Sequence, residues 1–257
     1  MYTYINEFAK KPGNGKFPHL ERADIVSGLK ERMASPQSVQ QSIASLCGPA
    51  CLAFTVLKNL PAMWASYVMS LYENGGAMLG RLHIQPSPGC RNVKLPRPAA
   101  KPENRTNIHP VDWVGLASLR DSENDNFEYN SPDDAFPGIT TAGELADWFR
   151  ALKMTDVRNE TNYWYGKDMG DLKKAAILFA QGYSVALFVN GEVLLSHRRG
   201  FWSFPDHWCV LNGNPHLGGP NKVISAPIFT WGKTRQVHVT EETFFEGFYG
   251  YVAGRWH

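Results

Sequence analysis

Three residues have the types and the spacing that nucleophilic catalysis by a thiol requires. Cys47 begins a helical pattern of apolar residues that runs to Leu60, and a helix N-terminus stabilises a thiolate through its dipole and its unused backbone amides. Gln41 precedes it closely enough for the side-chain amide to join the Cys47 backbone N–H in an oxyanion hole. His207 opens an apolar strand much later in the chain, where an imidazole can reach a helix N-terminus as general base. The set predicts a cysteine nucleophile with a histidine base and a glutamine oxyanion donor.

Helices are expected to carry the first part of this set. Each prediction depends on a local signal: a proline in the first turn, a capping residue, or a glycine after the last turn. The predicted helices are residues 47–60, residues 61–72 ending before Gly75, a helix from the Thr141 capping box to about Leu152, and a helix that Asp168 caps and Gly182 closes.

Strands are expected to carry His207. Residues 183–189, an Asn190-Gly191 turn and residues 192–196 predict a tight hairpin. The remaining predicted elements are a second hairpin from residues 207–212 and 222–232, a strand at 236–240, and a helix-like stretch at 241–250. Helices first and an antiparallel sheet last indicate an α+β fold. We expect residues 1–38 to be an N-terminal segment, a linker or arm, and residues 39–257 to be the catalytic domain.

Composition excludes several classes of protein. The 257 residues carry a net charge of +2 and only 19% charged side chains, which argues against a surface that coats nucleic acid. Hydrophobic residues make up 43%, too many for a disordered chain. We expect neither a signal peptide nor a membrane span, because the most apolar stretch, residues 175–189, is interrupted by polar residues and glycine. Four irregularly spaced cysteines favour a reducing compartment.

No cofactor or metal is expected. A zinc site would need Cys47, Cys51, His207 and Cys209 together, but the chain has no CxxC pair, and Cys209 lies deeper along its strand than His207. Cys51 and Cys209 are predicted to be core residues. Cys47 itself has a plainer interpretation, as a small buried hydrophobic residue, and the residue types alone leave both interpretations open.

The pattern resembles the papain-fold cysteine peptidases. Gln41, five intervening residues and then Cys47-Gly-Pro-Ala at a helix start, followed late in the chain by His207-Trp-Cys-Val-Leu, match that family's order of glutamine, cysteine and histidine. The resemblance implies a papain-like fold, in which a helical lobe carries Gln41 and Cys47 and an antiparallel sheet carries His207. The enzyme would be a cysteine endopeptidase.

A narrower resemblance covers most of the chain from about residue 40. Residues 46–80, 111–124, 138–149 and 229–232 are similar to papain-like toxin domains that bacteria deliver into competitors by type VI secretion. That likeness implies delivery by secretion machinery, action in the cytoplasm of a target bacterium, and a cognate immunity protein. It also implies protein substrates, type II DNA topoisomerase subunits among them, with no direct binding of nucleic acid or membrane.

One position departs from the papain pattern. Papain-like enzymes orient the histidine with Asn or Asp on the following strand, whereas antiparallel pairing here would place Thr230 and Trp231 opposite His207. We therefore predict that the Thr230 hydroxyl accepts the imidazole N–H, or that the site is a dyad. Asn212 is an odd number of strand steps from His207 and is expected to face away.

Two other functions remain open. A peptidoglycan amidase or glutamine deamidase would use the same nucleophile and base. A papain-like module with a degenerate site would bind a partner without catalysis.

The positions of two further groups of residues are also predicted from the sequence. Asp112, Arg120 and Asp121 are predicted to be a helix-surface set of salt bridges. The aromatic group Phe201, Trp202, Phe204 and Trp208 either packs in the core or lines a substrate cleft.

Overall fold

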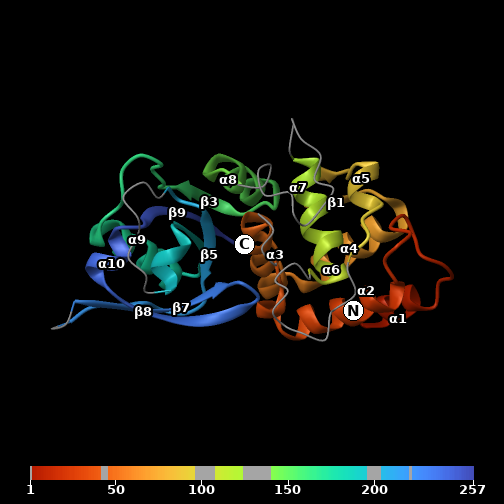
Figure 1. The fold of residues 1–257 in the computed structure, drawn as a ribbon, viewed down its shortest axis with the longest axis horizontal. Helices are drawn as coiled ribbons and strands as arrows, with labels where there is room; N and C mark the ends of the chain where they lie inside the picture. The colour runs from red at the N-terminus through yellow and green to blue at the C-terminus, as the bar shows by residue number, and fades with distance from the viewer. Residues whose placement is uncertain (1, 42–45, 96–107, 124–139, 196–203, 220–221) are drawn as a thin grey trace. The chain divides into compact units, whose positions relative to one another are not determined.

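The fold is known from a computed structural model, which describes residues 2–41, 46–95, 108–123, 140–195, 204–219 and 222–257. The chain divides into two compact units, Met1–Thr140 and Thr141–His257. Helices dominate the first unit and an antiparallel sheet dominates the second, so the α+β class predicted from the sequence is correct (Figure 1). The division does not coincide with the boundary expected after residue 38.

Helices of the first unit surround a buried central pair, α3 and α4. Both were predicted from the sequence, and their starts agree with the expectation. Every residue of α3 from Cys47 to Leu57 is buried, and α4 ends at Gly75, whose φ of 76° is the left-handed conformation that glycine favours. The elements are α1 (Tyr2–Ala9), α2 (Arg22–Ala34), η1 (Pro36–Ser38), α3 (Cys47–Asn59), α4 (Pro61–Asn74), β1 (Ala77–Leu79), β2 (Leu82–Ile84), α5 (Pro88–Arg91), α6 (Pro110–Asp112), the π-helical turn η2 (Trp113–Ala117) and α7 (Ser118–Ser122).

Residues 1–38 belong to the body of the first unit. The side chains of Ile5, Phe17, Ile25 and Leu29 are all fully buried. The helix α2 packs against α6, and its Arg32 is also buried. The apolar periodicity of this segment is weak because charged residues occupy part of the buried face. That is the physical reason why the sequence pattern suggested a linker or arm.

The stretch that follows α6 continues as a π-helical turn and then as α7. Gly115 in this turn lies against the indole of Trp64, where a Cβ atom would approach within 2.6 Å. The Tyr67 hydroxyl donates to the Gly115 carbonyl at 2.9 Å. The expectation that Asp112, Arg120 and Asp121 form a surface set is wrong, because all three are at most 8% exposed. Asp112 lies in α6 and the other two residues lie in α7. The helix α6 packs against α2, and α7 packs against α5, so these positions do not face solvent.

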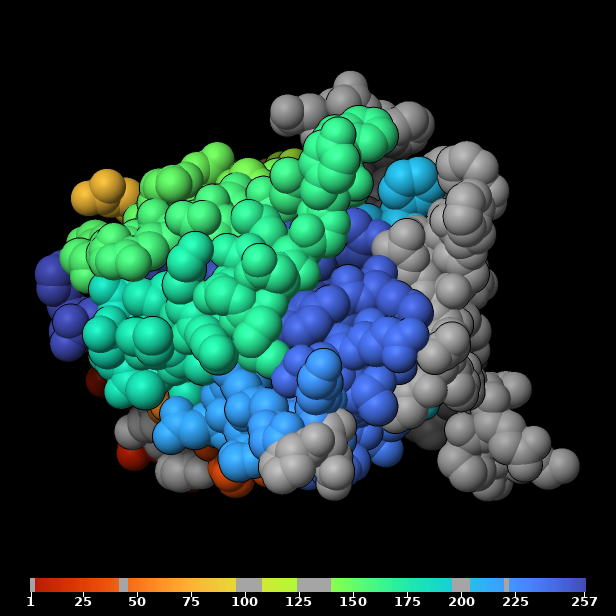
Figure 2. Space-filling view, turned by 90° about the vertical axis from the view of Figure 1, so that its left-hand side faces the viewer, coloured from red at the N-terminus to blue at the C-terminus, as the bar shows by residue number. Residues whose placement is uncertain are grey.

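The second unit is built on one antiparallel sheet with the order β3-β9-β4-β5-β7-β6, and β8 pairs with β7. Its strands are β3 (Thr155–Asn159), β4 (Tyr183–Val189), β5 (His207–Leu211), β6 (His216–Gly218), β7 (Val223–Thr230), β8 (Lys233–Thr240) and β9 (Phe248–Arg255). Its helices are α8 (Ala142–Ala151), α9 (Met169–Ala180), η4 (Gly191–Leu195) and α10 (Glu241–Phe245). The predicted capping box of α8 is present, as is the Asp168 cap of α9. In Figure 2 the residues from α8 to α9, green to teal, cover the upper left part of the view, and later residues of the chain, in blue, lie beside and below them.

The hairpin predicted at Asn190-Gly191 is wrong. Residues Gly191–Leu195 form a short 3-10 helix, and β4 pairs instead with β9 and β5. The Asn190 side chain explains the difference, because it accepts from the Glu192 amide at 3.1 Å and donates to the Phe204 carbonyl at 3.0 Å. These bonds start the 3-10 helix where an isolated Asn-Gly pair would turn a hairpin.

The predicted hairpin of residues 207–212 and 222–232 is correct in its pairing, since β5 pairs antiparallel with β7. The helix-like stretch at 241–250 is correct only over Glu241–Phe245. The remainder enters β9, an interior strand of the sheet. Gly250 allows this with a φ of 112°, and a Cβ atom there would lie 2.1 Å from the Glu160 carbonyl oxygen.

Candidate functional site

Cys47 is the first residue of α3, as the sequence predicted, and its side chain is 3% exposed. In an α-helix the first backbone N–H groups have no partner within the helix, so they point out of its N-terminus with the positive end of the dipole. Pro49 lies in this first turn and has no backbone N–H. The Ala50 N–H donates to the Leu46 carbonyl at 2.8 Å, as the first hydrogen bond of the helix. The backbone N–H groups at the end of the helix are therefore those of Cys47 and Gly48. A thiolate or an oxyanion would be stabilised at this end of α3.

A close contact fixes the first turn of α3. A Cβ atom on Gly48 would lie 2.2 Å from Oγ1 and 2.4 Å from Cβ of Thr140, and Thr140 is fully buried. Residue 48 therefore has to be glycine for the turn to lie this close to Thr140. The residue that follows the candidate nucleophile is constrained by packing as well as by the resemblance noted above.

Gln41 lies in the same unit as Cys47 and is 7% exposed. The segment that carries it leaves η1, which packs against α3, and is held by a hydrogen bond from the Gln40 backbone N–H to Asp112 Oδ2 at 3.1 Å. Residues 42–45, between Gln41 and the helix, lie outside the described part of the chain.

The other cysteines behave as core residues. All four cysteines of the chain are buried and none is in a disulfide. Cys90 is enclosed so completely that burial raises the pKa of its thiol well above the ordinary value, and the charge of Asp121 raises it further. Cys209 lies in β5 and its thiol points to the Leu187 carbonyl at 3.9 Å. The raised pKa keeps the Cys90 thiol protonated and unreactive at pH 7.

His207 begins β5 in the second unit, where the sequence predicted it. Its Nε2 lies 2.7 Å from Thr230 Oγ1, and both residues are buried. The contact expected from antiparallel pairing of these strands is therefore present, although a role for Thr230 in orienting a catalytic histidine stays a prediction. When the ring proton is on Nε2, that N–H donates to the Thr230 hydroxyl and Nδ1 keeps the lone pair that a general base needs.

Burial decides the charge of His207. It lowers the pKa of the imidazole from 6.5 to about 3, so the ring is neutral at pH 7. A neutral ring is the form that accepts a proton from a thiol. The carboxyl nearest in sequence, Asp206, does not take the orienting position, because its Oδ1 accepts from the Gly191 backbone N–H at 2.8 Å.

Trp231 was not singled out for its contact with the imidazole, but its indole stacks on the His207 ring, with the ring centroids 4.6 Å apart and an interplanar angle of 20°. Trp231 and Gly232 form the two-residue turn between β7 and β8, with φ values of 45° and 73°. A bulky residue rarely adopts a positive φ. The stacked ring is the visible reason for a tryptophan in a turn that favours Asn. Antiparallel pairing already placed Trp231 opposite His207, but no spacing rule in the sequence predicts that the two rings stack.

Asn212 faces away from the imidazole, as expected, because its Nδ2 donates to Thr234 Oγ1 at 2.8 Å on the exposed side of the sheet. An aromatic hollow of about 390 Å³ lies on the second unit, lined by Tyr163, Trp164, Phe204 and Pro205. Trp208 belongs to the core and stacks on Phe188 with the ring centroids 4.3 Å apart. Phe201 and Trp202 lie outside the described residues.

Within the ranges that the structure describes, no three His, Cys, Asp or Glu side chains gather as metal ligands. No helix in those same ranges is long and apolar enough to cross a bilayer. Comparisons with protein-family models, with curated proteins and with solved structures find no match to this chain. Any function of this chain must therefore be inferred from its own residues.

Proposed function

We propose that the chain is a papain-like cysteine peptidase, in which Cys47 is the nucleophile, His207 the general base and Gln41 an oxyanion donor. The observation that carries the proposal is the environment of His207. A histidine that is buried and neutral, held through Nε2 by the Thr230 hydroxyl and stacked on Trp231, has one ring nitrogen left for chemistry. The position of Cys47 at the start of α3 supplies the complementary half.

In the proposed reaction His207 acts first as a general base and then as a general acid. His207 takes the thiol proton as Cys47 Sγ attacks an amide carbonyl carbon, and the carbonyl oxygen becomes an oxyanion that the Gln41 amide and the Cys47 backbone N–H stabilise. His207 then gives its proton to the leaving amine as the C–N bond breaks. Water hydrolyses the thioester and restores the thiol. Because burial keeps the imidazole neutral at pH 7, base catalysis by His207 begins the reaction in this proposal.

The resemblance described from the sequence supports a biological role for this activity. The chain would be an antibacterial effector, delivered by secretion machinery and restrained by an immunity protein, that cleaves proteins in the cytoplasm of a target bacterium. Type II DNA topoisomerase subunits are the substrates that the resemblance implies. A peptidoglycan amidase, a glutamine deamidase and a catalytically inactive binding module are the competing functions.

A lysate experiment tests the proposed activity. Wild type and Cys47→Ala are incubated with a bacterial lysate, and new protein N-termini are identified by mass spectrometry. Cys51→Ala is the matched control, because it removes a buried thiol one turn along the same helix. The proposal expects a small set of new termini made by wild type and Cys51→Ala but absent with Cys47→Ala. Equal patterns in all three would remove endopeptidase activity on that proteome and favour the competing functions.

A second experiment tests whether His207 acts on Cys47. The rate of Cys47 alkylation by iodoacetamide is measured against pH for wild type and for His207→Gln. If His207 is the base for this thiol, the substitution lowers the alkylation rate at neutral pH and moves the profile toward that of an ordinary thiol. Identical profiles would separate His207 from Cys47 and leave the chain without a dyad.

A further inference from the structure

A buried ion pair connects the N-terminal helices to the segment that carries Gln41. Arg32, in the last turn of α2, directs two guanidinium nitrogens at Asp112 of α6, with Nη2 to Oδ2 at 2.7 Å and Nε to Oδ1 at 3.3 Å. The side chains are 4% and 2% exposed. A buried charged pair is seldom the most stabilising choice, because apolar residues of the same volume often do as well. Its presence calls for a role beyond holding two helices together.

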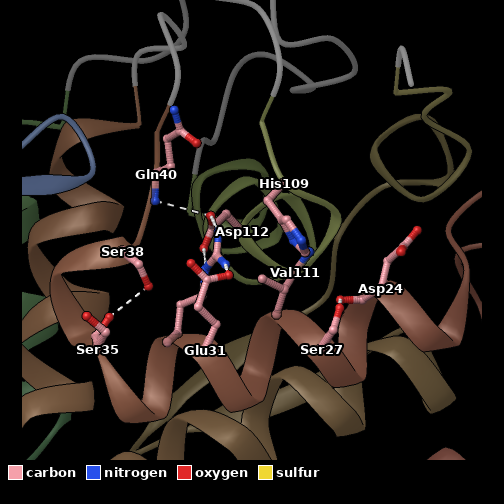
Figure 3. Close-up of polar contacts among 10 residues, drawn as sticks. Asp24, Ser27, Glu31, Ser35, Ser38, Gln40, His109, Val111 and Asp112 are labelled. Atoms are coloured by element: carbon pink, nitrogen blue, oxygen red, sulfur yellow. Dashed lines mark hydrogen bonds and ion pairs between the residues drawn. The ribbon is translucent and has the colours of Figure 1, made fainter. Parts of the chain in front are cut away.

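The carboxylate of Asp112 has a third donor. Its Oδ2 also accepts the backbone N–H of Gln40 at 3.1 Å, and Figure 3 shows this bond between the segment that carries Gln40 and Asp112. Burial raises the pKa of Asp112 to about 6, and Arg32 and this amide act in the opposite direction, because both favour the carboxylate form. Arg32 thus keeps in place the acceptor for the residue that directly precedes Gln41.

The same segment is held at its other end. The Ser38 hydroxyl donates to the Ser35 carbonyl at 2.7 Å, which closes the turn that leads out of α2 (Figure 3). Val39, between the two attachments, is fully buried. The helix α2 itself cannot shift easily against α6, because a Cβ atom on Gly28 would lie 2.5 Å from Val111. The backbone up to Gln40 is therefore fixed relative to α6.

We propose that Asp112 and Arg32 are positioning residues for the oxyanion donor: the pair holds the Gln40 amide and thereby sets where Gln41 presents its side chain. The inference rests on the proposed function, which gives Gln41 its role. Neither residue touches the substrate. Their effect is confined to steps that form an oxyanion, and it passes through Gln41.

Two reactions of Cys47 separate this role from general stability. With p-nitrophenyl acetate, Sγ forms a bond to the acetyl carbon through an oxyanion, p-nitrophenolate leaves, and the thiol proton passes to His207. With iodoacetamide, Sγ displaces iodide at a saturated carbon and no oxyanion forms. Loss of the Gln40 attachment should slow the first reaction by about 10- to 100-fold, as expected for a misplaced donor group, and leave the second unchanged.

The first variant pair acts on the donor. Gln40→Pro removes the backbone N–H and Gln40→Ala keeps it, while the side chain of residue 40 is exposed. Val39 before it has a ψ of 121°, a conformation that a following proline accepts. The proposal expects slow acylation in Gln40→Pro only. The second pair acts on the acceptor, in the Arg32→Met background: Asp112→Asn keeps an oxygen for the Gln40 amide, and Asp112→Leu does not.

Controls assign the cause. Each slow variant is also made with Gln41→Ala, where the difference within each pair should vanish if the effect passes through Gln41. Arg22→Met with Glu73→Gln removes another ion pair of α2, which joins it to α4, and should acylate like wild type. Equal acylation within both pairs overturns the inference, and so does a difference that persists with Gln41→Ala. A wild type that acylates no faster than Cys47→Ala overturns the proposed function and this inference with it.

Discussion

Replacing Thr230 by valine removes the hydroxyl that meets the imidazole of His207 and keeps the shape of the side chain. The Nε2 to Oγ1 distance is 2.7 Å, and Thr230 is 1% exposed and His207 5%. Water cannot replace the lost partner at such burial, so Nε2 is left unsatisfied. A buried polar group without its partner costs about 1 to 3 kcal/mol of the free energy of unfolding, and we expect Thr230→Val to lose that amount.

Urea unfolding at pH 7 measures the loss, with two matched controls. Thr230→Ser keeps the hydroxyl and should recover most of the stability. Thr234→Val makes the same substitution one strand along, where the hydroxyl accepts from Asn212 at 2.8 Å on the exposed side of the sheet. There water can take the place of the lost bond, and the expected cost is within about 0.5 kcal/mol.

The same variants test whether the contact orients a base. If Thr230 holds His207 in the tautomer that leaves Nδ1 free, Thr230→Val should slow p-nitrophenyl acetate acylation by about tenfold or more, and Thr230→Ser should restore it. Equal unfolding free energies for Thr230→Val and Thr234→Val would refute the reasoning about burial. An unchanged acylation rate, with the stability loss present, would leave Thr230 a structural residue only.

Three further predictions concern other parts of the chain. Gly48→Ala should destabilise the protein by about 1 to 3 kcal/mol through its contact with Thr140, and Thr140→Gly should relieve part of that loss in urea unfolding; additive effects of the two substitutions would contradict the contact. Burial lowers the folded-state pKa of His207 to about 3, so its contribution to the free energy of unfolding is full above pH 6.5 and falls by about 1.4 kcal/mol per pH unit below that value. Between pH 7 and 5 the wild type should therefore lose stability relative to His207→Gln in urea unfolding. Parallel plots of unfolding free energy against pH for the two proteins would refute this. Thr141→Ala removes the hydroxyl that accepts the Glu144 amide at 3.2 Å, and thermal unfolding should show a loss of about 1 kcal/mol, whereas an unchanged melting temperature would mean that the α8 cap contributes nothing.

Local signals were sufficient for the helices that position the site. The start of α3 at Cys47, the start of α4 at Pro61, and the caps at Thr141 and Asp168 all follow from side chains within a few residues of the helix end. Such signals act through one turn of backbone and need no partner from elsewhere in the chain. For that reason α3, α4, α8 and α9 begin where the sequence predicted.

The two-residue turns show the limit of local reasoning. Asn190-Gly191 has the stronger hairpin signal, yet the chain uses Trp231-Gly232 for its tight hairpin between β7 and β8. The Asn190 side chain forms hydrogen bonds with the Glu192 amide and with the Phe204 carbonyl, fourteen residues away, and the chain continues as a 3-10 helix in place of a hairpin turn. Trp231 accepts a positive φ where its ring stacks on His207. Tertiary contacts outweighed a backbone preference of about 1 to 2 kcal/mol per residue.

The sequence by itself determined the types of the candidate catalytic residues, their order along the chain, the helix start at Cys47, and the strand pairing that brings Thr230 to His207. Tertiary structure alone decided that α2 is part of the first unit, that Arg32 and Asp112 are buried together, and that the Gln40 amide is bound to their carboxylate. Arg32 and Asp112 are 80 residues apart. Their burial depends on how α2 and α6 pack, and the apolar periodicity of the two segments does not predict that packing.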